Sequence, residues 1–268
     1  MRATQKQNHL IIKRYGESAL LLEWKQEISE KVNASVHQMM QHLSSQELLG
    51  LESMIPAYCS LLIIFDKSKI TFNELQDLIR NLSFDSHEND KSKIEASLAG
   101  NVEKSGPNSN EKKWRIPVCY DGEFFLDEKK LSTELRLSRE EMIQLHTSGS
   151  YRVYMMGFLP GFPYLGKLPE RLRAKRLTSP RSKVLAGSIA ITDLQTGIYP
   201  QNSPGGWNVI GKTPIPLIEE SQLGMSLPSA FLFAPGDWVS FYSINKSEYK
   251  ELTEQVKQGA LKLHDLHE

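Results

Sequence analysis

A chain of 268 residues has room for one large domain or two modest ones. With 40% hydrophobic and 24% charged residues it is not a wholly disordered protein, and 32 basic against 32 acidic side chains argue against a globally charged nucleic-acid binder. The sequence has no apolar run long enough to span a membrane and no apolar core of a signal peptide near its start, so we expect a cytoplasmic protein without membrane contact. Two cysteines, Cys59 and Cys119, are too few for a disulfide framework and fit a reducing compartment.

Residues 1–84 predict a small α/β domain with the element order β-β-α-β-β-α. Two apolar runs, Leu10–Arg14 and Ala19–Trp24, are separated by a hairpin-like Tyr-Gly-Glu-Ser. Apolar residues at helical spacing follow, from Ile28 to Leu43, and the run SLLIIF at 60–65 is typical of a buried strand. A second helical pattern covers Phe72–Leu82, so the simplest assembly is a small sheet covered by two helices.

Residues 85–113 are polar, lack aromatic side chains and are rich in Ser, Asn, Lys and Glu. Such a segment cannot bury enough apolar area to offset the entropy of ordering it, so we predict a linker or mobile loop. A short amphipathic helix over Ile94–Val102 is the alternative.

Residues 114–246 predict a β-barrel or sandwich domain, because short apolar runs alternate with Gly/Pro turn signals. The first strand is expected at Trp114–Tyr120, and a helix with a Ser138/Glu141 capping box ends near His146. Residues 247–268 hold a last helix, expected over Glu248–Leu263. The remaining expected strands are Tyr151–Phe158, Lys183–Ile191, Trp207–Ile210 and Trp238–Ile244.

The segment Gly206–Thr213 matches the phosphate-loop pattern G-x-x-x-x-G-K-T in its letters. A true phosphate loop needs a flexible, helix-opening backbone. Here the central Trp, Val and Ile favour a strand, and Pro216 follows closely. We interpret this segment as a strand, so it is no evidence that the chain binds ATP.

Metal and nucleophile chemistry receive little support from the sequence. His146 is the one histidine among the Gly/Pro motifs, without H-x-x-x-H or C-x-x-C spacing, so we predict no metal site. No G-x-S-x-G elbow occurs either. At a helix end, His146 could serve as a general base or as a hydrogen-bonding anchor.

Residues 146–213 carry nine Lys or Arg side chains against two acids, Glu170 and Asp193. This surplus could bind a carboxylate, a phosphate or an acidic partner, or it could be a solvated basic face. The same region holds five motifs that combine Gly or Pro with aromatic and single polar residues, which is typical of functional loops but also of tight barrel turns. The motifs are GFLPGFPYL at 157–165, PR at 180–181, AGS at 186–188, QTGIYP at 195–200 and SPGGW at 203–207.

Together with Pro117–Tyr120, Ile210–Pro214 and Pro235–Asp237, these motifs resemble the family of 5-oxoprolinase B subunits, also described as allophanate hydrolase subunit 1 or the KipI-type kinase inhibitor. The resemblance implies an α+β fold, with a small ferredoxin-like α/β N-terminal domain and a cyclophilin-like β-barrel C-terminal domain. It also implies a protein that is inactive alone and works with a homologous C subunit and a separate A subunit. That complex converts 5-oxo-L-proline to L-glutamate and uses ATP as its co-substrate.

Within this family the sequence predicts two catalytic residues, Arg181 and His146. Arg181 lies in the basic stretch and offers a planar fork for phosphoryl or carboxylate charge. The predicted substrate-binding residues come from the Gly/Pro motifs: Ser188, Gln195, Tyr199 and Trp207. Two alternatives stay open: an inhibitor that binds a sensor histidine kinase, which shares every motif, and a peptidyl-prolyl isomerase, suggested by fold alone.

Overall fold

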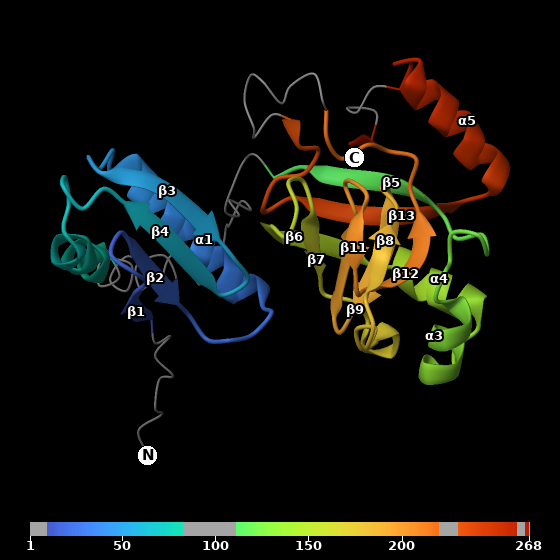
Figure 1. Cartoon of the computed structure of the whole chain (residues 1–268), viewed down its shortest axis with the longest axis horizontal. Coiled ribbons are helices and arrows are strands. Elements are labelled where there is room, and N and C mark those ends of the chain that lie inside the picture. Colours follow the sequence, from blue (N-terminus) through green and yellow to red (C-terminus); the bar gives the residue numbers. More distant parts are fainter. Residues whose placement is uncertain (1–9, 83–110, 220–229, 262–265, 268) are drawn as a thin grey trace, which may run out of the picture. The chain divides into compact units, whose positions relative to one another are not determined.

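The computed structural model describes residues 10–82, 111–219, 230–261 and 266–267 (Figure 1). The chain divides into two compact units, residues 1–109 and 110–268, which are taken in turn below. Most of the predicted linker lies outside the described residues, together with the alternative helix over Ile94–Val102. None of the described helices combines the length and apolar character that a bilayer crossing would need.

The first unit is a four-stranded antiparallel sheet with two helical segments. The order of its strands across the sheet is β1-β2-β4-β3. Along the chain, β2, α1, β3, β4 and the helical residues 72–82 follow the β-α-β-β-α order of ferredoxin-like folds. The strand β1 precedes them and pairs with β2 at the edge of the sheet. The elements are β1 (Ile11–Arg14), β2 (Ala19–Glu23), α1 (Glu30–Ser45), β3 (Leu51–Pro56) and β4 (Ser60–Phe65).

The core of the first unit lies between one face of this sheet and its helices. Alternate residues of the two central strands are buried, as the period of a strand requires; examples are Leu20 and Leu22 of β2 and Leu61 of β4. They pack in one cluster with Val36 of α1 and Ile79 of the second helical segment. The apolar stripes seen in the sequence are therefore core packing.

The second unit is a closed barrel of seven strands in the order β10-β7-β6-β13-β5-β12-β9, with a separate two-stranded ribbon β11-β8. The long strands β5 and β13 run parallel over their whole length, from the pair Lys113↔Trp238 to Cys119↔Ile244. The strands are β5 (Lys113–Cys119), β6 (Ser150–Met156), β7 (Pro163–Gly166), β8 (Arg181–Val184), β9 (Ser188–Thr192), β10 (Gln195–Ile198), β11 (Ser203–Gly205), β12 (Asn208–Lys212) and β13 (Trp238–Ile244). The helices are α3 (Glu128–Leu135), α4 (Arg139–Thr147), the short η1 (Glu170–Leu172) and α5 (Lys246–Lys257).

The predicted fold class is confirmed: the chain is α+β, with a small α/β unit and a closed β-barrel unit. The predicted Ser138/Glu141 capping box is present at α4. The strand interpretation of the phosphate-loop pattern is also confirmed, because β12 occupies its centre and pairs with β9, and residues 213–219 contain no helix.

Two expected elements differ from the structure at glycines. The strand expected over Lys183–Ile191 is two strands, because Gly187 has φ +80° and a Cβ there would lie 2.5 Å from the Thr213 carbonyl oxygen. The last helix ends at Lys257 rather than Leu263, since Gly259 takes a left-handed φ of +65° just beyond the C-cap, the usual way to stop a helix.

Asp237 ties the start of β5 to the turn that precedes β13. Its carboxylate is buried and accepts hydrogen bonds from the Trp114 indole at 2.9 Å, the Ala234 amide at 2.9 Å and the Lys112 amide at 3.1 Å. An ionised carboxylate is the side chain that can accept from three donors at once. This explains the Pro-Gly-Asp motif, in which Gly236 adopts φ +102° and allows the turn.

We expect Asp237→Asn to lower the free energy of unfolding by about 1–3 kcal/mol, because the amide replaces an acceptor with a donor and leaves buried N–H groups unpaired. Urea unfolding of the full chain measures this. The control is Glu254→Gln, on the exposed face of α5, which should change stability by less than about 0.5 kcal/mol. Equal stabilities for the two variants would contradict the assignment.

Candidate functional site

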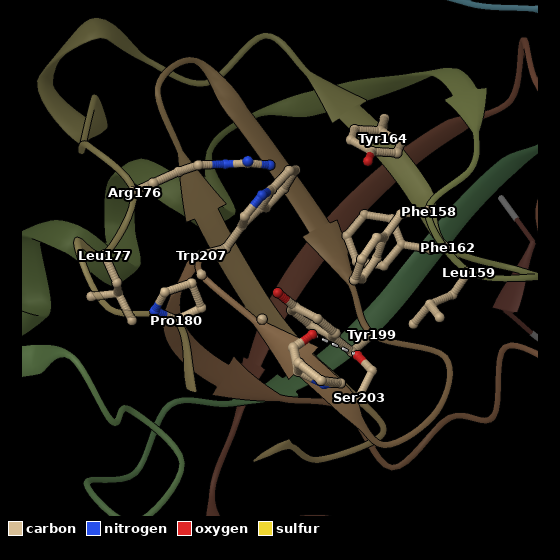
Figure 2. Close-up of a pocket in the computed structure, with 13 residues that line it drawn as sticks. Phe158, Leu159, Phe162, Tyr164, Arg176, Leu177, Pro180, Tyr199, Ser203 and Trp207 are labelled. Carbon is tan, nitrogen blue, oxygen red and sulfur yellow. Dashed lines mark hydrogen bonds between the residues drawn. The ribbon is translucent and has the colours of Figure 1, made fainter. Parts of the chain in front are cut away.

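A pocket of about 420 Å³ opens in the barrel unit where the β6–β7 turn, the β8–β11 ribbon and the segment before β8 meet (Figure 2). This volume falls within the range of small-molecule sites. The walls are mostly aromatic and aliphatic, with few polar groups. The lining residues are Phe158, Leu159, Phe162, Tyr164, Arg176, Leu177, Pro180, Tyr199, Ser203, Pro204, Gly205, Gly206 and Trp207.

Phe162 is the centre of an aromatic cluster that forms the pocket floor. Its ring lies edge-to-face with three others, at centroid distances of 5.2 Å to Tyr199, 5.5 Å to Trp207 and 5.1 Å to Tyr164. Such edge-to-face pairs add about 0.5–1.5 kcal/mol each beyond the burial of area. Phe162, Tyr199 and Trp207 are at most 4% exposed, so the rings of the floor are closely packed against their surroundings.

Two glycines of the sequence motifs make room for these rings. A Cβ at Gly197 would lie 2.9 Å from the Phe162 ring, and a Cβ at Gly205 would lie 2.3 Å from the Tyr199 hydroxyl oxygen. Real Cβ atoms essentially never come so close to a neighbour. Gly197 of QTGIYP and Gly205 of SPGGW, which lie in β10 and β11, are thus required by aromatic packing.

The turn between β6 and β7 supplies the pocket rim. The Phe162 amide donates to the Leu159 carbonyl at 3.0 Å, and the Gly157 amide donates to the Phe162 carbonyl at 3.1 Å, which closes the turn. Gly161 and Phe158 both adopt positive φ, +79° and +65°. Phe158 is 61% exposed, so its ring lies open to solvent at the edge of the pocket.

Few polar groups face the pocket. Burial raises the pKa of the Tyr164 and Tyr199 hydroxyls, and the positive charge of Arg176 opposes that rise at both. The Ser203 hydroxyl donates to the Pro204 carbonyl at 3.0 Å. Arg176 extends beside Trp207 in Figure 2 and is the cation among the lining residues.

Of the predicted substrate-binding residues, the structure brings Tyr199 and Trp207 together in this pocket. Ser188 and Gln195 lie elsewhere in the barrel wall. Ser188 is buried in β9, and Gln195 in β10 is paired across the sheet with Gly166 and Thr192. Neither lines the pocket, and their predicted role stays a prediction.

Arg181 lies just outside the pocket, next to the lining residue Pro180. Its Nη2 donates to the Asp127 carboxylate at 2.7 Å, and the second oxygen of that buried carboxylate accepts from the Val209 amide at 2.7 Å. The guanidinium thereby ties β8 to β12 and to the start of α3. Its Nη1 has no hydrogen-bond partner among the described residues, so the catalytic role predicted for Arg181 stays a prediction.

His146 lies inside the barrel, with no exposed surface, and is not a pocket residue. Its Nδ1 is 2.7 Å from the Tyr120 hydroxyl and its Nε2 is 3.1 Å from the Thr196 hydroxyl. Burial lowers the pKa of His146 to about 3, so the ring is neutral near neutral pH. Its carbonyl also accepts from the Tyr151 hydroxyl at 2.7 Å. This is the geometry of the hydrogen-bonding anchor, one of the two alternatives that the sequence left open, and the catalytic role remains only a prediction.

The sequence did not single out Arg176, Tyr164, Phe158 or Phe162 as individual site residues, although three of them lie in the GFLPGFPYL motif. The GFLPGFPYL motif was the feature of the sequence that could indicate these three residues. Choosing its members required knowing that β7, β10 and the ribbon face a common space. Among the residues that the structure describes, no cluster of His, Cys, Asp and Glu could hold a metal ion.

Comparison with known proteins places this architecture in a class. Residues 10–227 match the family described as the carboxyltransferase domain, subdomain C and D. At 18% identity and a TM-score of 0.72 over 94% of this chain, the K. lactis urea amidolyase, of which 16% is covered, shares the fold. The structure of TTHA0988 shares 29% identity with a TM-score of 0.66 over 85% of this chain, which spans only 40% of that longer chain.

Within that class the similarity is more specific. The B subunit of 5-oxoprolinase from Bacillus subtilis (strain 168) is 38% identical over 244 residues, which is 91% of this chain and 97% of the relative. The chain belongs to the family of 5-oxoprolinase B subunits, within the carboxyltransferase subdomain C and D proteins. The family resemblance seen in the sequence motifs is confirmed.

The burial of His146 predicts an acid-sensitive barrel. The unfolded chain binds a proton at His146 near its ordinary pKa of 6.5, whereas the folded chain binds one only near 3. Between these values the unfolded state holds more protons, so the free energy of unfolding should fall as pH falls, by up to about 1.4 kcal/mol per pH unit. Urea unfolding from pH 6 to pH 4 measures the slope.

The variant His146→Gln should remove this part of the slope, while His42→Gln, at an exposed position of α1, should keep it. A slope that is the same in the His146 and His42 variants would show that His146 is protonated in the folded barrel.

The ion pair between Arg181 and Asp127 should stabilise the barrel. Arg181→Met leaves the buried Asp127 carboxylate without its cation, so we expect a loss of about 1–3 kcal/mol in the free energy of unfolding. In a double-mutant cycle with Asp127→Asn, the coupling should exceed about 1 kcal/mol. Arg173→Met is the matched control, because Arg173 is exposed and lies 3.8 Å from the exposed Asp193. A coupling near zero would mean that the pair does not hold β8 in place.

Proposed function

We propose that this chain is the B subunit of an ATP-dependent 5-oxoprolinase that converts 5-oxo-L-proline to L-glutamate. The observation that carries the proposal is the similarity to the 5-oxoprolinase B subunit of Bacillus subtilis, 38% identical over 97% of that relative. The two chains correspond almost end to end, so the comparison concerns a whole protein rather than one shared module.

The reaction explains why ATP is needed. The lactam of 5-oxoproline is a resonance-stabilised amide, and water attacks such a carbonyl slowly. Transfer of the ATP γ-phosphoryl group to the amide oxygen would convert that oxygen into a leaving group. That transfer would release ADP. Water would then add to the carbon, and opening of the C–N bond would free the amine and leave γ-glutamyl phosphate. A second water would hydrolyse this acyl phosphate to glutamate and phosphate. Fixed cations stabilise the charge that develops on a transferred phosphoryl group.

The composition of the pocket supports a role in an assembly of several subunits. Its described lining holds no carboxylate, imidazole or thiol that could act as base or nucleophile. The phosphate-loop pattern is a strand, so it offers no cradle for ATP. The missing chemistry would come from a homologous C subunit and a separate A subunit.

Co-expression with the A and C subunits, followed by an assay of 5-oxoproline-dependent ATP hydrolysis, tests the proposal. The purified chain alone should hydrolyse ATP at background rate, and the complex of all three subunits should release glutamate and phosphate in equal amounts. Omission of this chain should abolish turnover.

Robust turnover by the single chain, or an active A–C complex without it, would refute the proposed role. If the complex is inactive but the chain inhibits autophosphorylation of a sensor histidine kinase, the kinase-inhibitor alternative replaces it.

A further inference from the structure

We propose that the aromatic pocket holds 5-oxo-L-proline itself, with Arg176 binding the carboxylate and the rings around Trp207 enclosing the lactam. This assignment rests on the proposed function for the identity of the ligand. It places the substrate on this chain, at a site distinct from both predicted catalytic residues, Arg181 and His146.

The first argument is the state of Arg176. Other arginines in the same stretch have acidic partners: Arg171 lies 3.4 Å from Glu141, and Arg181 lies 2.7 Å from Asp127. Among the described residues, no carboxylate lies within ion-pair distance of Arg176, although its side chain lines the pocket. An arginine on an apolar wall offers a planar fork that matches a carboxylate.

The second argument is that the charge of Arg176 acts inside the pocket. It lowers the pKa of Tyr164 and of Tyr199, two hydroxyl groups on different walls, against the raising effect of burial. Arg181, outside the pocket lining, acts in the same direction on Tyr199. Arg176 is the arginine that lines the pocket and also acts on both hydroxyls.

The third argument is the form of the walls. Trp207, Phe162 and Tyr199 are buried and fixed by edge-to-face contacts, so a ligand would order few side chains on binding. Aromatic faces and the neighbouring Pro180 suit a compact ring with methylene groups. The tyrosine hydroxyls can bond a lactam N–H or C=O.

The fourth argument distinguishes a ring acid from a nucleotide. A triphosphate carries several charges and is normally held by many backbone amides together with cations. Among the described residues, the lining of this pocket includes one cation, Arg176, and its Gly205 makes room for the Tyr199 ring. One cation beside an apolar cage fits a monoanion.

Saturation-transfer NMR with the full chain and 5-oxo-L-proline tests the assignment. Saturation of the protein should appear on the ring methylene protons of the ligand. Arg176→Gln should weaken binding at least about tenfold, since a hydrogen bond to a charged group is lost. Phe158→Ala, at an exposed rim position, should weaken it by a smaller factor. Arg171→Gln, which changes a neighbouring cation outside the pocket lining, should bind like the wild type.

The neutral amide of 5-oxoproline is the matched ligand control. It should bind weakly and equally to the wild type and Arg176→Gln. The assignment is overturned if 5-oxo-L-proline gives no saturation transfer, or if Arg176→Gln binds it as the wild type does. It is also overturned if a prolyl peptide without a free carboxylate binds more tightly and independently of Arg176, since the pocket would then be a peptide groove.

The same variants in the complex of all three subunits separate this assignment from the proposed function. An active complex whose KM for 5-oxoproline is unchanged by Arg176→Gln would keep the function and place the substrate elsewhere. An inactive complex in which this chain still binds 5-oxoproline through Arg176 would keep the site and refute the function.

Discussion

The close approach of the Phe162 ring to the backbone of Gly197 is the contact on which the candidate site depends. The ring occupies the space that a Cβ would take, and this brings Tyr199, Trp207 and Tyr164 into edge-to-face contact with it. A larger residue at 197 would force the Phe162 ring to move. The packing of the pocket floor therefore requires a residue without a Cβ at this position, and Gly205 has the same role beside the Tyr199 ring.

Buried polar groups hold the barrel around this cluster. Asp237, Asp127 and His146 each bond to segments distant in sequence, and each is almost completely removed from water. A buried polar group that loses its partner costs more free energy than the bond contributes when made, so such groups specify one arrangement of the strands. The β8–β11 ribbon is tied to β12 through Asp127, and this ribbon carries one wall of the pocket.

The distribution of charge gives the two arginines different roles. Arg181 forms an ion pair with the buried carboxylate of Asp127. Arg176 lines the pocket and has no acidic partner among the described residues. The basic surplus of residues 146–213 is thus partly structural. The proposed reaction needs cations for the substrate carboxylate and for phosphoryl charge, and Arg176 is the one that we propose for the carboxylate.

Local sequence determined the elements whose signals are local. The Ser138 capping box and the strand in the phosphate-loop pattern could be read directly, because propensity and capping depend on nearby residues. The concentration of Gly, Pro and aromatic residues also indicated the part of the chain that forms the pocket. The short strands β7, β10 and β11 escaped prediction, since their Pro and Gly residues become strands only through pairing across the barrel. The sequence also could not show that Arg176 lines the pocket while Arg181 pairs with Asp127, because the carboxylate of Asp127 lies 54 residues away from Arg181 along the chain.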